Sequence, residues 1–385
     1  MLQALNSDIL LSICFKVDIS DLHSLLSITL MDFKFIGIHI NTILYAKLRD
    51  KSKLDLTIFT KEELFKLSKI TNCNNTLGSC TNGIDNYKFV SMNHELYYMN
   101  KSETPIFIDY DIIQISCSYN SALFLTKEGR IYTYDTQNDI FDELVISEKI
   151  VQVASSGSHW LALTVNGDVY CYGLNDSGQL GLGDKRRRHK LTYISYLHDI
   201  INISAGSACS LFVSANGVTY ISGYCDGITT LNQEIVYWPI AIPDLGNIKK
   251  AVAGYSHLLF LTRDNKVYIC ATKVGTGRFT TYGNGIHEII FPVDVEIINI
   301  AIGLQHALVL TAKGKVYGWG SNENKQLNLT IPGSDQPILI PLLSEETIIE
   351  IAAGDSCTMA ISNKNKLYII GDYRPFWYPV KVSYK

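Results

Sequence analysis

The sequence lacks long hydrophobic runs, Cys-x-x-Cys pairs and a large excess of charge of either sign. No apolar stretch approaches the roughly 18 to 20 residues that cross a bilayer, and the N-terminus has neither the cationic start nor the cleavage site of a signal peptide. The 33 basic and 37 acidic side chains leave a formal charge of −4, which argues against a surface built to coat nucleic acid or chromatin. We therefore expect a protein of the cytoplasm or nucleus without membrane contact.

Sites for covalent chemistry are lacking as well. The nine cysteines are an odd number and the nine histidines are dispersed, which fits neither a disulfide framework nor a zinc cluster. No phosphate-binding loop or nucleophile elbow occurs, and Gly275-Thr276-Gly277 does not continue into a dinucleotide loop because Thr280 replaces the third glycine. We expect no enzymatic activity, no cofactor and no metal, and we interpret the cysteines as small buried hydrophobes.

A twelve-residue frame recurs along most of the chain. Its plainest copies are VASSGSHWLALT from Val153, AVAGYSHLLFLT from Ala251 and IAIGLQHALVLT from Ile300. Weaker copies begin at Ile115, Ile203 and Ile351, with a worn one at Cys80. Six residues beyond each copy stands a tyrosine, namely Tyr97, Tyr132, Tyr170, Tyr220, Tyr268, Tyr317 and Tyr368. Successive tyrosines lie 35 to 51 residues apart, which falls in the period range of propeller blades and other repeat arrays.

Each unit is predicted to contain a β-hairpin. The run from His159 to Thr164 is short and apolar, as in a strand buried on both faces, and Asn166-Gly167 then supplies a turn before the next apolar run. A glycine recurs just before the hairpin, where a missing Cβ would permit either close backbone approach or a positive φ. It occurs at Gly83, Gly206, Gly254, Gly303 and Gly354, while Ser118 and Ser156 are the departures.

The fold class follows from how such hairpins can be covered. One hairpin cannot bury both of its faces, so the units must stack, and closing them into a ring removes the exposed ends that an open solenoid would have to cap. We predict an all-β seven-bladed β-propeller over residues 71–385, preceded by a small N-terminal α-helical module over residues 1–70. The open solenoid is the alternative.

The units resemble the repeats of the regulator of chromosome condensation family. The glycine-rich tail of that repeat appears as GLNDSGQLGLGD from Gly173 to Asp184, and its skeleton returns as GSNENKQLNL from Gly320 to Leu329. The resemblance implies a propeller with one of several functions. The best-known member exchanges guanine nucleotide on the small GTPase Ran and docks on nucleosomes, and relatives include ubiquitin-ligase components and a photoreceptor. The photoreceptor needs a tryptophan cluster, whereas this chain has four tryptophans.

The first seventy residues show helical periodicity instead. Two short apolar stripes follow the capping residues Asn6-Ser7 and Ser20-Asp21, and their spacing resembles an F-box, the helical module that binds the Skp-type adaptor of cullin ubiquitin ligases. Asn6 stands where an F-box usually has a proline after its first leucine. The resemblance implies that a Skp-type adaptor contacts Leu5, Ile9, Leu10, Ile13, Leu22 and Leu25. The alternative is a helical cap that buries its whole stripe on the propeller.

The dense charge cluster of the sequence follows the first tail. Lys185, Arg186, Arg187 and Arg188 lead into His189-Lys190 and form a candidate partner-binding loop for phosphate, an acidic protein patch or a nuclear import receptor. A solvated loop is the alternative. The family's repeats often carry an arginine at the place of Arg188, which implies a structural role for that residue. One such loop does not establish chromatin binding, which needs a larger basic face.

Histidines share one position of the frame at His159, His257 and His306. A metal site is one interpretation. Equivalent residues in separate blades do not converge at ligand distance unless they line the axis, so packing or hydrogen bonding at strand ends is favoured. The seven tyrosines are predicted in the blade cores, each with a partner for its hydroxyl if buried.

The functional expectation is a non-enzymatic protein-interaction adaptor. Its F-box-like helices would dock on a Skp-type ubiquitin ligase and its propeller would recruit a target protein in a eukaryotic cell, its own or a host's. A guanine-nucleotide exchange factor or effector of a Ran-like small GTPase is the first alternative. A chromatin- or protein-binding scaffold is the second.

Overall fold

A computed structural model of the chain describes the following residues: 58–59, 76–79, 88–92, 95–100, 112–118, 121–135, 140–156, 159–224, 234–243, 245–255, 257–271, 285–291, 295–364, 366–371 and 378–381. The chain divides into two compact units, Met1–Lys69 and Ile70–Lys385. The described part of the first unit is the short strand β1 (Ile58–Phe59). The predicted helices, and with them all six F-box-like positions, lie outside the described residues.

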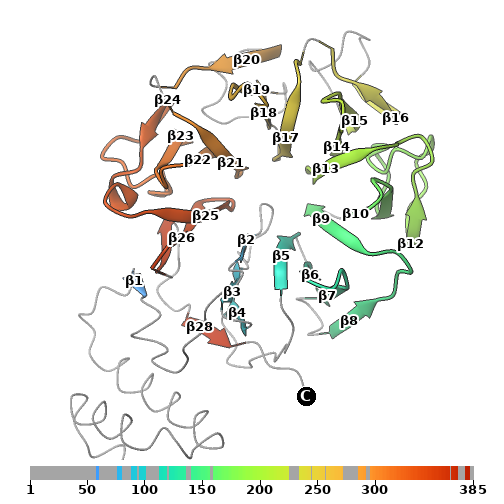
Figure 1. The fold of residues 1–385 in the computed structure, drawn as a ribbon, viewed down its shortest axis with the longest axis horizontal. Helices are drawn as coiled ribbons and strands as arrows, with labels where there is room; N and C mark the ends of the chain where they lie inside the picture. The colour runs from blue at the N-terminus through green and yellow to red at the C-terminus, as the bar shows by residue number, and fades with distance from the viewer. Residues whose placement is uncertain are drawn as a thin grey trace, which may run out of the picture. The chain divides into compact units, whose positions relative to one another are not determined.

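The second unit is built from antiparallel sheets arranged around a ring (Figure 1). Five sheets each contain four strands that are consecutive in the chain, with the first strand of each nearest the centre. These strands are β5 (Ile112–Cys117), β6 (Ser121–Thr126), β7 (Ile131–Asp135), β8 (Ile140–Leu144), β9 (Ile150–Ser156), β10 (His159–Thr164), β11 (Val169–Gly173), β12 (Arg188–Tyr193), β13 (Ile200–Ala205), β14 (Cys209–Ser214), β15 (Thr219–Tyr224), β16 (Ile235–Ala241), β17 (Ile248–Ala253), β18 (His257–Thr262), β19 (Val267–Ala271), β20 (Gly285–Ile289), β21 (Ile297–Ile302), β22 (His306–Thr311), β23 (Val316–Ser321) and β24 (Gly333–Leu339).

The last sheets join the two ends of the second unit. A 3-10 helix, η3 (Pro341–Leu343), leads to β25 (Ile348–Ala353), β26 (Cys357–Ser362) and β27 (Leu367–Gly371). At the other end β2 (Thr76–Ser79), β3 (Lys88–Met92) and β4 (Glu95–Asn100) form a sheet with β28 (Tyr378–Lys381), which pairs antiparallel with β4. Since β2 contacts both β5 and β25, the sheets close into a ring. The prediction of an all-β propeller is confirmed, and side chains are described in six of its sheets.

The predicted hairpins are present. Strands β10 and β11 pair antiparallel, and the turn between them is closed by bonds from Thr164 N to Asp168 O at 2.9 Å and from Gly167 N to Thr164 O at 3.1 Å. Gly167 has φ of +84°, which glycine adopts without a Cβ clash. Its carbonyl then accepts a bond from Ile200 N in the next blade. The turn therefore also fixes the start of the following blade.

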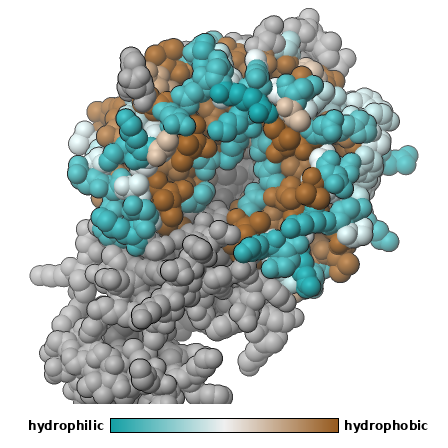
Figure 2. Space-filling view, viewed as in Figure 1, coloured by the Kyte–Doolittle hydropathy of each residue, from teal (hydrophilic) through white to brown (hydrophobic). Residues whose placement is uncertain are grey.

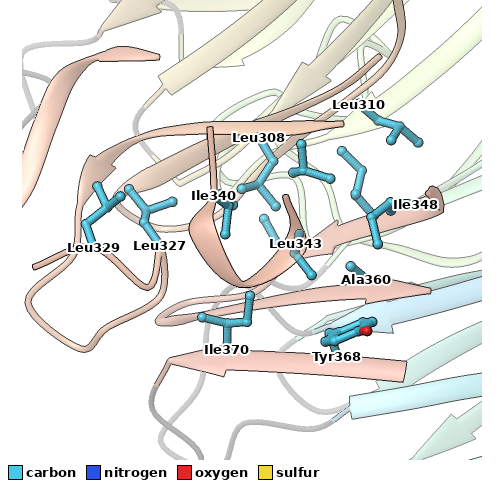
Figure 3. Close-up of a cluster of buried hydrophobic side chains, with 13 residues drawn as sticks. Leu308, Leu310, Leu327, Leu329, Ile340, Leu343, Ile348, Ala360, Tyr368 and Ile370 are labelled. Atoms are coloured by element: carbon cyan, nitrogen blue, oxygen red, sulfur yellow. The ribbon is translucent and has the colours of Figure 1, made fainter. Parts of the chain in front are cut away.

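Hydrophobic clusters fill the spaces between neighbouring blades. In one of them Leu308 and Leu310 of β22 pack with Ile348 of β25 and with Tyr368 and Ile370 of β27 (Figure 3). Each fully buried aliphatic or aromatic side chain of this kind stabilises the fold by about 1.5 to 3 kcal/mol. Stacking of blades, rather than any single sheet, supplies the core.

The frame tyrosines are buried or half-buried wherever their side chains are described. Tyr368 Oη donates a hydrogen bond to Glu346 Oε1 at 2.6 Å, and Tyr170 Oη donates to Glu148 Oε1 at 3.2 Å. Tyr268 Oη donates to Glu288 Oε2 at 3.4 Å. The expectation of a hydroxyl partner is therefore confirmed at these three tyrosines.

The frame glycine serves close packing of the blades. Among Gly206, Gly254, Gly303 and Gly354 none has a positive φ. An added Cβ at Gly206 would lie 2.9 Å from the carbonyl oxygen of Gly254, and one at Gly303 would lie 2.2 Å from that of Gly354. Of the two roles that the sequence left open, the structure selects the close backbone approach.

Polar side chains tie the innermost strands together. Gln114 of β5 donates to Val153 O and accepts from Val153 N, both at 2.9 Å, and Gln152 of β9 holds Ile203 of β13 in the same way. Asn202 of β13 then accepts a bond from Ala251 N at 2.9 Å. The inner edge strand of a sheet has backbone groups that the sheet leaves unpaired, and these amides bond such groups in β9, β13 and β17.

The innermost strands of six sheets, β5, β9, β13, β17, β21 and β25, each have a bulge at their second residue. A bulge turns a side chain out of the regular alternation. The residues turned out at 41% to 44% exposure are Val151, Ile201, Ile298 and Ile349. Figure 2 shows hydrophobic residues beside the central hollow.

Candidate protein-binding surface on one blade

The loop between β11 and β12 is held by one buried asparagine. Asn175 Nδ2 donates to the Asp184 carbonyl at 2.7 Å, and Leu180 N donates to Asn175 Oδ1 at 2.9 Å. Gln179 Oε1 accepts a bond from Ser177 N at 2.9 Å. These bonds give the glycine-rich tail a defined conformation that presents the basic run at its end.

The second tail, between β23 and β24, repeats this arrangement. Asn322 Oδ1 accepts a bond from Leu327 N at 2.9 Å, and Gln326 Oε1 accepts one from Asn324 N at 3.0 Å. Lys325 has φ of 63° where the first tail has a glycine, so the asparagine and glutamine hold the loop without that glycine. The similarity predicted from the two tail sequences is confirmed in three dimensions.

Arg188 is engaged within the loop. Its Nη1 and Nη2 lie 3.1 Å and 2.8 Å from the two carboxylate oxygens of Asp184, a bidentate pair. Hydrogen bonds from this guanidinium hold the pKa of Asp184 below its ordinary value. Of the four basic residues predicted to bind a partner, Arg188 therefore has the structural role that the family resemblance implied.

We expect Arg188→Gln to loosen the loop and Arg187→Gln to leave it unchanged. Loss of a partly exposed bidentate pair should cost up to about 1 kcal/mol, whereas a free surface arginine should change stability by less than about 0.5 kcal/mol. Urea unfolding of both variants and limited proteolysis of the loop measure this difference. Equal behaviour of the two variants would contradict the structural assignment of Arg188.

Lys185, Arg186 and Arg187 are exposed on the same loop. Lys185 Nζ lies 5.3 Å from the centre of the Tyr237 ring in the next blade, within range of a cation–π interaction. Within the described part of the chain, no side chain pairs with the guanidinium of Arg186 or Arg187. These two arginines are available to a partner.

An exposed aromatic pair lies beside the basic residues. Trp238 of β16 and Tyr196 are 45% and 60% exposed, and their rings meet edge to face with centroids 4.5 Å apart. A Cβ at Gly183 would lie 2.0 Å from Trp238 Cζ2, so this glycine makes room for the indole. The next-blade strand is also joined to the loop by a bond from Gly183 N to Tyr237 O at 2.9 Å.

We call this region the basic–aromatic surface. It lies on the segments that flank β12 and on β16 of the neighbouring blade (Figure 1), and it comprises Lys185, Arg186, Arg187, Tyr196, Tyr237 and Trp238. Sequence analysis identified the three basic residues and missed the aromatic ones. The available signal was Tyr237-Trp238-Pro239, which carries two large aromatics in the outer strand of a unit.

The frame histidines lie in separate blades, where they bond or pack. His159 Nε2 is 2.9 Å from Ser210 Oγ of the next blade, and the Ser210 hydroxyl donates to Gln179 O at 2.7 Å, so His159 Nε2–H is the donor. His306 Nε2 is likewise 3.1 Å from Thr358 Oγ1. Burial lowers the pKa of His159, His257 and His306 to about 4. The interpretation as packing and hydrogen-bonding residues is confirmed.

The described residues include no further site for metal or thiolate chemistry. No group of three or more His, Cys, Asp or Glu side chains there is placed to hold a metal ion. The five described cysteines are buried, and burial raises the pKa of Cys171 and Cys270 to about 12, so neither is a reactive thiolate. Among the helices that the structure describes, none has the length and apolar character to cross a membrane.

Comparisons with known proteins agree with the repeat. Family models of the regulator of chromosome condensation (RCC1) repeat match residues 166–213 and 313–361, and a second such model matches residues 150–179 and 297–326. The chain is 26% identical over 291 residues to the E3 ubiquitin-protein ligase HERC2 of Mus musculus, which covers 68% of this chain and 6% of HERC2.

Two further similarities cover a larger share of the other protein. The secretion-regulating guanine nucleotide exchange factor of Bos taurus is 26% identical over 225 residues, covering 53% of this chain and 48% of that protein. The crystal structure of Prp20p from Saccharomyces cerevisiae superposes with a TM-score of 0.59 at 16% identity, covering 80% of this chain and 82% of that one. At this identity the superposition shows the fold alone. The chain spans a small part of HERC2 and about half of the exchange factor.

Proposed function

We propose that this chain is a β-propeller of the regulator of chromosome condensation repeat family and that it is a non-enzymatic adaptor of ubiquitin ligation. In this proposal the ring has seven blades, counting the sheet that β28 completes, and recruits a target protein. The N-terminal F-box-like stripe, centred on Leu10, docks on a Skp-type adaptor. The protein acts in the cytoplasm or nucleus of a eukaryotic cell.

The basic–aromatic surface is the observation that supports recruitment of a protein. It combines two exposed arginines, which no described side chain pairs, with an exposed Tyr196–Trp238 pair on loops held by buried hydrogen bonds. Arginine, tyrosine and tryptophan are the residues that most often dominate binding energy at protein interfaces. A rigid ring that carries such loops is suited to recognition without chemistry. The similarity to HERC2, a ubiquitin ligase by name, favours ubiquitin ligation as the setting.

A second candidate is guanine-nucleotide exchange on a Ran-like small GTPase. The similarity to a protein named as an exchange factor favours it. Exchange works through differential binding to the nucleotide-free and nucleotide-bound states, so it needs no acid, base or nucleophile. Release of a fluorescent nucleotide from a panel of small GTPases distinguishes this candidate from an adaptor. A scaffold for chromatin or protein is weaker, because a net charge of −4 argues against the large basic face that chromatin binding needs.

We expect the full chain to capture a recombinant Skp-type adaptor, and Leu10→Asp to abolish capture. A carboxylate in an apolar contact is desolvated without a partner, which costs several kcal/mol and weakens binding by at least a hundredfold. Leu10→Met is the matched control, because it keeps volume and apolarity and should retain capture. Both variants should show the same unfolding transition of the propeller. If the unmodified chain captures no Skp-type adaptor, the adaptor function is wrong.

A further inference from the structure

We propose that the basic–aromatic surface binds an acidic segment of a partner protein that carries one apolar anchor residue. The inference rests on the proposed recruitment function and names the chemistry of the recruited protein. Its parts are the exposed basic residues of one blade and the aromatic pair between that blade and the next.

The charge of the loop calls for carboxylates. In the run from Asp184 to Lys190 the one acidic side chain is Asp184, and both of its oxygens are bonded by Arg188. Arg186 and Arg187 are exposed, and a guanidinium recognises a carboxylate through two parallel hydrogen bonds. The guanidinium groups of Arg186 and Arg187 therefore form a positive surface, because the one carboxylate of the run is already paired with Arg188.

The aromatic pair supplies a place for an apolar anchor. Trp238 and Tyr196 are 45% and 60% exposed, whereas Trp319 of the ring is fully buried. The indole packs closely over Gly183, which leaves room for it, and meets the Tyr196 ring edge to face. An anchor residue therefore meets rings that lose little conformational freedom on binding, which favours affinity.

Geometry and charge favour a polypeptide over nucleic acid. The tyrosine and tryptophan rings are inclined at 78°, so they do not form parallel walls between which a base could stack. The run contributes few free cations, and the whole chain has a net charge of −4. Tight nucleic-acid binding usually neutralises about 6 to 10 phosphates, which exceeds what this loop offers.

The test uses the full chain and fluorescence anisotropy with four labelled probes. The first is a set of short peptides with one leucine, phenylalanine or tryptophan among aspartates and glutamates. The second replaces the acidic residues with lysine, the third replaces the anchor with serine, and the fourth is oligothymidine. We expect binding of the first set, weaker at high salt because exposed charge pairs are screened. The lysine peptides should not bind, and the serine peptides should bind about tenfold more weakly.

Variants assign the binding to this surface. R186Q/R187Q should weaken the acidic peptides about tenfold, and Trp238→Ala should weaken them tenfold or more while removing the preference for an anchor. The matched control is K127Q/K313Q, which removes two exposed lysines from the turns of other blades and should leave affinity unchanged. Tyr196→Ser repeats the aromatic test at a side chain with less structural contact, and circular dichroism verifies folding.

The outcomes separate this inference from the adaptor function. Acidic peptides that bind no better than lysine peptides, or R186Q/R187Q and Tyr196→Ser variants that bind as the unmodified chain does, would overturn the inference. Preferential binding of oligothymidine would overturn it as well. If acidic peptides bind as expected but no Skp-type adaptor is captured, the ligase role fails and the inference stands.

Discussion

Replacing Gly303 with alanine is expected to destabilise the propeller by about 3 kcal/mol, the upper range for an overpacked site. The new Cβ would lie 2.2 Å from the carbonyl oxygen of Gly354 and 2.6 Å from His306 Cε1. Neither neighbour can yield easily, because one is backbone of the next blade and the other is a buried ring that bonds Thr358. Relief therefore requires the two blades to move apart.

Two glycines provide graded controls for this substitution. At Gly254 the nearest atom to an added Cβ is the carbonyl oxygen of Gly303 at 3.1 Å, so Gly254→Ala should cost about 1 kcal/mol. At Gly246 an added Cβ meets nothing within 4 Å, and Gly246→Ala should change stability by less than about 0.5 kcal/mol. Urea unfolding of the three variants measures the series. Equal stability of Gly303→Ala and Gly246→Ala would show that the blades are not in close contact at this glycine.

Acidification from pH 7.5 to 5.5 is expected to lower the stability of the propeller by about 4 kcal/mol. Burial lowers the pKa of His159, His257 and His306 to about 4 in the folded state, against an ordinary value of 6.5. Between these values the unfolded chain binds more protons than the folded one. The stabilisation is therefore complete above the ordinary pKa and is lost as the pH falls toward the folded-state pKa. About 1 pH unit below the ordinary pKa, each histidine has lowered the free energy of unfolding by roughly 1.4 kcal/mol.

His159→Gln and His306→Gln test which groups carry this dependence. Glutamine keeps a hydrogen-bond donor toward Ser210 or Thr358 but does not titrate. Each substitution should remove about one third of the change in unfolding free energy between the two pH values. Asp184 and Glu346 also have a lowered pKa. The stabilisation that these carboxylates give is lost at a lower pH than that of the histidines, so they contribute little to the change between pH 7.5 and 5.5. If a variant that carries both substitutions keeps the full pH dependence, the assignment of that dependence to the buried histidines is wrong.

The repeat itself could be predicted from residue spacing. The hairpin at His159 to Thr164, the turn glycine at Gly167 and the tyrosine at Tyr170 follow local rules of strand periodicity and turn conformation, which act within one unit. The tail loops could also be predicted, because Asn175 and Gln179 satisfy backbone groups of their own loop. Such short-range contacts leave a pattern in the sequence.

The amino-acid sequence thus determined by itself the repeat, the β-hairpins and the family resemblance. Only the tertiary structure decided that the frame glycines serve contact between blades and that Trp238 lies beside the basic loop. The physical reason is the distance along the chain. Gly303 meets Gly354 and Gly183 meets Trp238 about one repeat apart, and a contact between blades depends on how the sheets pack around the ring.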